Sequence, residues 1–127
     1  MRRSSTAGAS ATSCLATARQ LGAALGLGSD QFTIAFQSRL GRSRWIQPYT
    51  EETLRALASR GVRRLAVACP SFVADCLETL EEIDLVASRV FKQAGGEVFA
   101  RVPCLNDDAA WTLGAIDLIR DQAAAQG

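Results

Sequence analysis

Three carboxylates, Asp75, Glu78 and Glu82, follow one another at helical spacing. At about 100° per residue, a helix would place them within a ~60° arc of one face. Carboxylate oxygens are hard ligands, so such a row would suit a divalent cation. The alternative is an ordinary solvated helix face, opposite an apolar face that covers a sheet. That apolar face would consist of Val73, Leu77, Leu80 and Ala87.

A second group of candidate residues lies just before position 50. Three arginines, at positions 39, 42 and 44, are close in sequence to Trp45 and Tyr49. Guanidinium groups beside a flat aromatic ring suit a planar ligand that carries carboxylates. The same residue types would also suit a nucleic-acid base with its phosphates, or a solvated surface loop.

The chain contains no histidine, and its four cysteines are widely spaced. Acid–base or metal chemistry must therefore use carboxylates, cysteines or a group from another chain. The cysteines form no CxxC pair, so we expect free thiols in a reducing compartment and no iron–sulfur cluster. They are Cys14, Cys69, Cys76 and Cys104.

Length and charge narrow the class of protein. The 127 residues suffice for one domain, and a net charge of +1 gives no field that would attract nucleic acid. No apolar run approaches the roughly 18 residues of a membrane span. We expect a cytoplasmic protein with at most a peripheral membrane contact. The acid-free segment 1–29 resembles an organellar transit peptide, but we favour an unstructured leader.

Apolar periodicity, with glycine and proline stops, predicts the elements that position these residues. We expect helices at 13–25, 50–60, 72–93 and 107–123, and strands at 32–36, 62–69 and 97–102. This alternation predicts an α/β fold: an open three-layer lobe with a mainly parallel sheet. The continuously apolar strand core at 65–68 predicts cover on both faces of that sheet. The predicted divisions are a leader at 1–13, the lobe at 14–122 and a flexible tail at 123–127.

Both groups of candidate residues follow a predicted strand. The arginine loop follows 32–36, and the acidic helix follows 62–69. Ligands of parallel α/β sheets bind beyond the carboxyl ends of the strands. We therefore expect both groups at the ligand-binding edge.

Five segments, in this order, resemble the bacterial form of the ferrochelatase family, whose members insert iron(II) into a porphyrin. They are FQSRLG at 36–41, WIQPYT at 45–50, FVADCLETLEEI at 72–83, AGGE at 94–97 and PCLND at 103–107. The resemblance runs from about Cys14 to Ile119, which is most of the chain. It implies a Rossmann-like lobe, the C-terminal half of a two-lobe enzyme. The lobes would hold protoporphyrin IX or coproporphyrin in the cleft between them.

The resemblance also implies residue roles. Glu78 would be the catalytic carboxylate at the metal site, with Glu82 and Asp75 on an acidic path for the metal. Iron(II) would be a substrate. A partly desolvated Glu78 with a raised pKa could accept a pyrrole proton. The residues implied to bind the porphyrin are Trp45, Gln37, Ser38 and Arg39.

The chain departs from the family pattern across the cleft. The family carries a histidine there, in a Ser-Phe-His-Gly type motif upstream of the matching region, and this chain has none. Val86 also stands where some relatives carry a further acid. We therefore expect a C-terminal lobe that is inactive without a missing N-terminal lobe, from a truncated gene or a split enzyme. The alternative is a non-catalytic porphyrin- or haem-binding module. A nucleotide-binding domain is disfavoured because no glycine-rich phosphate loop follows a strand.

Overall fold

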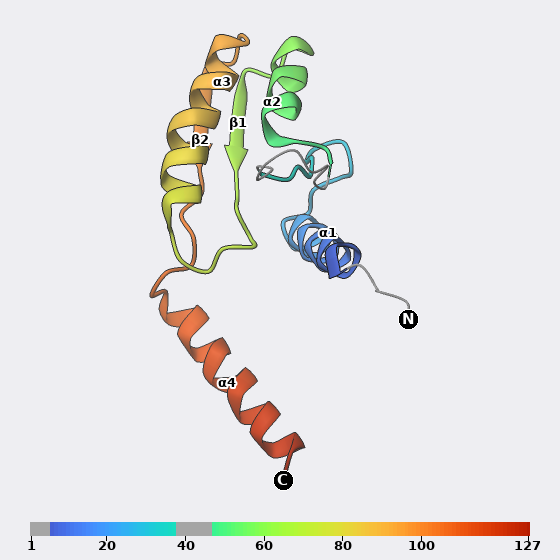
Figure 1. The fold of residues 1–127 in the computed structure, drawn as a ribbon, viewed down its shortest axis with the longest axis vertical. Coiled ribbons are helices and arrows are strands. Elements are labelled where there is room, and N and C mark those ends of the chain that lie inside the picture. Colours follow the sequence, from blue (N-terminus) through green and yellow to red (C-terminus); the bar gives the residue numbers. More distant parts are fainter. Residues whose placement is uncertain (1–5, 38–46) are drawn as a thin grey trace.

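The computed structural model describes residues 6–37 and 47–127, and for residues 6–10 it describes the backbone only. In chain order, the elements are α1 (Thr6–Ala24), α2 (Thr50–Ser59), β1 (Arg64–Val67), the π-helix η1 (Glu78–Ala87), α3 (Ser88–Gln93), β2 (Val98–Arg101) and α4 (Ala109–Ala125). Figure 1 shows α2, both strands and the long helix formed by η1 and α3 in one body, from which α4 extends away.

The two strands are parallel neighbours. Leu65 of β1 lies opposite Phe99 of β2, and Val67 lies opposite Arg101. The crossover between the strands runs through η1 and α3. The predicted α/β class is therefore confirmed, together with the parallel pairing of the two later strands.

The strand predicted at 32–36 is wrong. Phe36 makes an isolated parallel bridge with Tyr49, and one bridge provides no ladder of hydrogen bonds. The apolar residues of this segment lie in a different environment. Phe32, Ile34 and Phe36 line a groove beside β1.

Helices cover one face of the sheet. Leu65, Val67 and Phe99 pack against a buried core that helices α2, η1 and α3 provide. On the opposite face, Ala66 and Ala100 are exposed. The described helices that pack on the sheet therefore form one layer, on the face that carries Leu65, Val67 and Phe99. The core residues are Leu54, Ala58, Ile83, Ala87 and Phe91.

The helix predicted at 72–93 begins later than expected, because a distant asparagine holds the preceding loop. The side-chain oxygen of Asn106 accepts a hydrogen bond from the backbone N–H of Asp75 (2.8 Å). The backbone N–H of Asn106 donates to the carbonyl oxygen of Val73 (2.8 Å). These backbone groups of the loop are therefore bonded outside any helix, and η1 begins only at Glu78.

The π-helical form of η1 changes which face is buried. Hydrogen bonds in a π-helix run from i to i+5, so the helix is wider than an α-helix. Leu77 and Leu80, predicted to cover the sheet, are 72% and 47% exposed. Glu78 and Glu82 each precede a buried residue, so they lie beside the buried row and not opposite it. The buried row repeats every four residues: Thr79, Ile83, Ala87 and Phe91.

Helices α1 and α4 pack against none of the other described helices and strands. Helix α1 begins at Thr6, inside the predicted leader, and the chain turns after it through Gly26, whose φ of 69° suits glycine. Helix α4 begins after Asp108, whose carboxylate accepts hydrogen bonds from two backbone N–H groups of the first turn. It ends at Ala125, inside the predicted tail. The division into leader, lobe and tail stays a prediction.

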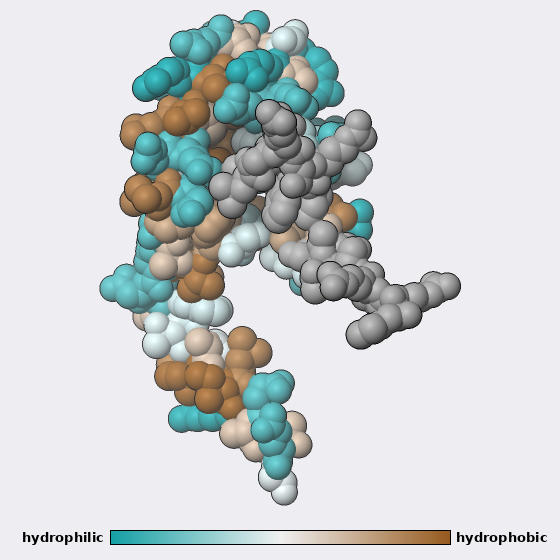
Figure 2. Space-filling view, viewed as in Figure 1, coloured by the Kyte–Doolittle hydropathy of each residue, from teal (hydrophilic) through white to brown (hydrophobic). Residues whose placement is uncertain are grey.

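The surface of α4 is largely apolar. Leu113 and Ile119 are 64% and 69% exposed, and α4 buries none of its residues. Figure 2 shows a hydrophobic patch on the upper part of this helix, with hydrophilic side chains beside and below it. None of the described helices is both long enough and apolar enough to cross a bilayer.

Gly96 provides a test of the packing that holds η1 and α3 on the sheet. A Cβ atom at this position would overlap the ring of Phe91, which is fully buried. We expect Gly96→Ala to lower the free energy of unfolding by about 1–3 kcal/mol, because the core cannot take the extra methyl group. Urea unfolding followed by circular dichroism measures this loss.

Gly114 is the matched control, because a Cβ there meets no atom within 4 Å. It lies within α4, where alanine favours the helix over glycine by roughly 0.5–1 kcal/mol. We expect Gly114→Ala to leave the urea midpoint unchanged or higher. Equal losses for the two variants would contradict a specific clash with Phe91.

Candidate functional site

A single side chain joins the end of the 32–37 segment to the two glutamates of η1. The Nε2 of Gln37 donates to the backbone carbonyl oxygen of Glu78 (2.9 Å) and lies 3.4 Å from Oε2 of Glu82. Both glutamates are exposed. The structure therefore brings together three residues that the sequence placed in one site.

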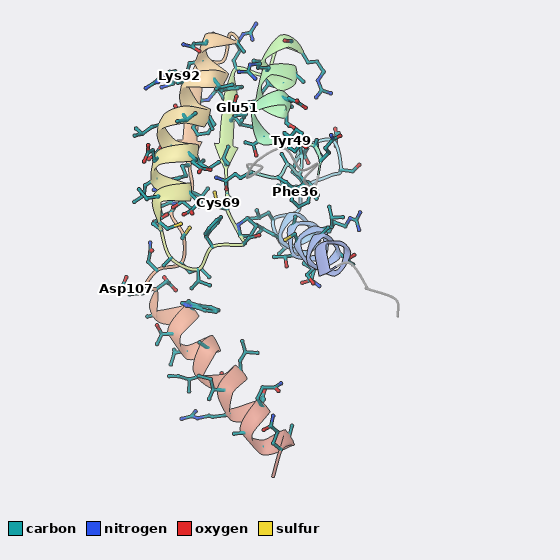
Figure 3. All side chains as sticks on the ribbon, in the orientation of Figure 1. Phe36, Tyr49, Glu51, Cys69, Lys92 and Asp107 are labelled. Atoms are coloured by element: carbon teal, nitrogen blue, oxygen red, sulfur yellow. The ribbon has the colours of Figure 1, made fainter. Side chains whose placement is uncertain are left out.

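These residues lie on the rim of an apolar groove with a volume of about 830 Å³. Residues of α1, the 32–37 segment, α2 and β1 line the groove. Glu78 and Glu82 are among its lining residues, together with apolar side chains such as Ile34 and Phe72. Figure 3 shows Phe36 and Tyr49 side by side near this region, with Cys69 at the end of β1. The groove combines an apolar floor with two carboxylates at its edge.

A smaller cavity of about 440 Å³ lies between the first turn of α2 and η1. Glu51 and Glu52 of α2 line it, and Glu51 pairs with Arg55 at 3.2 Å. Glu82 lines this cavity as well as the apolar groove. Its carboxylate therefore lies where the two spaces meet.

Asp75 does not share a helix face with Glu78 and Glu82, so the prediction of three aligned carboxylates is wrong. It precedes η1, and Arg101 Nη1 donates to its Oδ1 at 2.7 Å. The Asn106 side chain donates to its Oδ2 at 3.0 Å. That amide, together with the Thr79 hydroxyl, lowers the pKa of Asp75 to about 2. Both oxygens of this carboxylate are occupied within the chain.

The pKa of Glu78 is lowered, whereas we expected a raised value. The Cys76 thiol is the largest cause, followed by the backbone N–H of Glu78 itself. The side chain is exposed, so burial has little opposing effect. Glu78 is therefore ionised at neutral pH in this chain. That state suits attraction of a cation better than uptake of a proton.

A ready-made metal site is not assembled in the described part of the chain. Among the described residues, no three Cys, Asp or Glu side chains are gathered closely enough to hold a metal ion. All four cysteines are free and partly buried. Burial raises the pKa of the thiols of Cys69 and Cys104, which keeps both protonated at neutral pH. Glu78 and Glu82 would need a further ligand to bind a metal.

Sequence reasoning missed Arg101 and Asn106, which hold Asp75. A signal was present, because Arg101 is a charged residue at the end of the otherwise apolar strand β2. Nothing in the local pattern identified its partner, 26 residues earlier. Several predicted residues lie outside the described residues: Ser38, Arg39, Arg42, Arg44 and Trp45.

Comparisons with known proteins point to one family. A family model described as Ferrochelatase matches residues 6–123. The chain is 55% identical over 100 residues to a protein named ferrochelatase from Pseudomonas fluorescens biotype C, covering 79% of this chain and 29% of that protein.

Two further relatives carry the same name. The protein from Azotobacter vinelandii is 53% identical over 107 residues, which is 84% of this chain and 32% of the relative. The protein from Vibrio parahaemolyticus is 55% identical over 95 residues, which is 75% of this chain and 30% of the relative. The chain thus spans about a third of the length of the curated relatives it matches.

The lowered pKa of Asp75 predicts a loss of stability in acid. Its pKa is about 2 in the folded chain and near 3.8 when the side chain is free, so folding favours the ionised form. The resulting stabilisation is complete above pH 4 and is lost as the pH falls towards 2. We expect Asp75→Asn to flatten the fall in urea midpoint over this range. Asp121→Asn, at an exposed position near the end of α4, is the control and should keep the steep fall.

Proposed function

Because the chain belongs to the ferrochelatase family, we propose that it is the C-terminal lobe of an enzyme that inserts iron(II) into a porphyrin during haem biosynthesis. The observation that carries this proposal is the contact of Gln37 with both Glu78 and Glu82. Both glutamates also line the apolar groove. A flat hydrophobic macrocycle and a divalent cation require this combination of surfaces.

The carboxylates fit the two tasks of metal insertion. The incoming ion must lose water, and two pyrrole protons must leave the macrocycle. Glu78 and Glu82 are hard oxygen ligands, and as anions they favour the approach of the cation. When a porphyrin covers Glu78, desolvation raises its pKa and lets it accept a proton.

The segment that begins at Gln37 is proposed to form the porphyrin side of the site. Trp45 would lie against the macrocycle, since a flat aromatic surface suits a planar ring. Arg39 and Ser38 would hold carboxylate groups on the porphyrin, which guanidinium and hydroxyl donors bind well. Asp75 is not included in the proposed metal path, because Arg101 and Asn106 occupy its oxygens.

We propose that a second lobe completes the site. The chain has no histidine and spans about a third of its relatives' length. A proton acceptor on the far side of the macrocycle would therefore come from that lobe. On this proposal the 127 residues alone insert no iron, and the assembled enzyme works in the cytoplasm, with at most a peripheral membrane contact.

Two observations favour a second candidate, a porphyrin-binding module without catalysis. The described residues do not gather a metal-binding set, and the pKa of Glu78 is lowered in the open chain. The groove could then hold a porphyrin or haem without metal insertion. The two candidates differ in one measurable property, which is turnover once a second lobe is supplied.

A chimera tests the proposed role of Glu78. The chain replaces the matching 107 residues of the Azotobacter vinelandii relative, which supplies the remaining lobe. We expect Glu78→Gln to lower the rate of iron insertion by about 10²–10⁴-fold, as for loss of a general base. The amide keeps the shape but neither accepts a proton nor neutralises a cation. Porphyrin affinity, measured by fluorescence, should change little.

Glu81→Gln is the matched control, because Glu81 is exposed on the same helix but lines neither cavity. It should leave the insertion rate nearly unchanged. If both variants lose the same activity, Glu78 is one charge on a solvated surface. If the unmutated chimera binds porphyrin without inserting iron, the binding module is the better description.

Trp45→Ala tests the proposed porphyrin wall. Loss of the indole removes a flat apolar surface, and we expect porphyrin affinity in the chimera to fall about tenfold or more. Trp111→Ala is the control, because Trp111 lies on α4, away from the groove. Equal effects of the two substitutions on porphyrin binding would place the macrocycle elsewhere.

A further inference from the structure

We infer that Arg101 is a positioning residue: paired with Asp75 and Asp84, it holds the π-helix in the form that presents Glu78 and Glu82 together. The catalytic part of this inference rests on the proposed function, whereas the structural part does not.

The Arg101 side chain lies on the covered face of the sheet. It is opposite Val67, which packs against the core, and only 10% of the side chain is exposed. Burial of a guanidinium group is unfavourable unless charged partners and hydrogen bonds compensate for lost water. An arginine at this position therefore requires fixed acidic partners.

The two acidic partners stand on either side of the proposed metal-site residues in the sequence. Asp75 precedes η1 and bonds Arg101 Nη1 at 2.7 Å. Asp84 belongs to η1, and its Oδ2 lies 3.6 Å from Arg101 Nε, an ion pair in which Nε makes no hydrogen bond. Glu78 and Glu82 fall between these two contacts. The arginine thus ties both the loop before the helix and the helix itself to the end of β2.

Asn106 makes the first of these contacts rigid. Its side chain accepts from the backbone N–H of Asp75 and donates to the carboxylate of the same residue (2.8 and 3.0 Å). The Thr79 hydroxyl, fully buried in the first turn of η1, donates to Oδ1 of Asp75 at 2.9 Å. Asp75 therefore serves as a fixed anchor for the start of the helix.

The π-helical form explains why an anchor is needed. Long π-helices are rare, so a run of i→i+5 bonds over ten residues needs support from outside the helix. If η1 relaxed to i→i+4 bonding, Glu82 would rotate about the axis relative to Glu78. Gln37 could then no longer contact the Glu78 carbonyl oxygen and the Glu82 carboxylate together.

Amide hydrogen exchange on the 127-residue chain tests the structural part. We expect Arg101→Met, which removes the charge and keeps a long side chain, to speed exchange of the η1 amides about tenfold or more. The α2 amides should change much less, and Arg101→Lys should restore part of the protection. Arg63→Met is the matched control, because Arg63 bonds the Ala58 carbonyl oxygen at the other end of the strands (3.0 Å).

A milder variant keeps the test decisive if Arg101→Met does not fold. Asp84 is 49% exposed, so Asp84→Asn removes one contact of Arg101 with little other disturbance. It should also speed exchange within η1. Faster exchange by the same factor throughout the chain would show general destabilisation and overturn the inference. Unchanged exchange in η1 would overturn it too.

The chimera tests the catalytic part. We expect Arg101→Met to lower kcat for iron insertion about tenfold or more while leaving the KM for porphyrin nearly unchanged, because Arg101 lines neither the apolar groove nor the smaller cavity. If Glu78→Gln lowers kcat and Arg101→Met does not, the positioning role is wrong and the proposed function stands. If no form of the chimera inserts iron but η1 loses protection in Arg101→Met, the proposed function fails and the structural part stands.

Discussion

The ion pair between Arg101 and Asp75 is the contact on which the site depends. A guanidinium group on the covered face of a small sheet has few ways to be satisfied, and its partner comes from the loop after the neighbouring strand. Once Asp75 is fixed there, it cannot take part in a helix face with Glu78. Together with the hydrogen bonds of Asn106, this contact accounts for the late start of η1 and for the division of the acidic residues into two groups.

A second constraint is the uncovered face of the sheet. Parallel strands are normally covered on both sides, and helices cover β1 and β2 on one. The chain also exposes apolar residues in the groove beside β1 and on α4. The chain spans about a third of the length of the curated relatives it matches.

The sequence predicted those features that depend on local pattern. Helices α2 and α3 end just before Gly61 and Gly95, which do adopt positive φ angles, and the apolar runs that follow these glycines form β1 and β2. The start of η1 could not be predicted this way, because it depends on Asn106, a partner 31 residues away. Apolar residues do alternate at 32–36, but a strand also needs a neighbouring strand to pair with, and this segment makes only one isolated bridge among the described residues.

The candidate site shows the same division. Residue type and family resemblance identified Gln37, Glu78 and Glu82, and these do lie together. Residue type and resemblance could not identify the contact of Arg101 with Asp75, because a single arginine in a short strand is usually a surface charge. The directions of the two glutamate side chains also depend on the π-helix. The spacing of 100° per residue used to predict them is that of an α-helix.

The exposed apolar surface of α4 has a consequence for the life of this chain in a cell. Chaperones and proteases bind exposed apolar surfaces, and they act on those molecules in which the surface is not covered. A partner that buries the surface protects the chain by mass action. The steady-state amount of the chain would then follow the amount of that partner, and degradation would set the ratio of the two whatever their rates of synthesis.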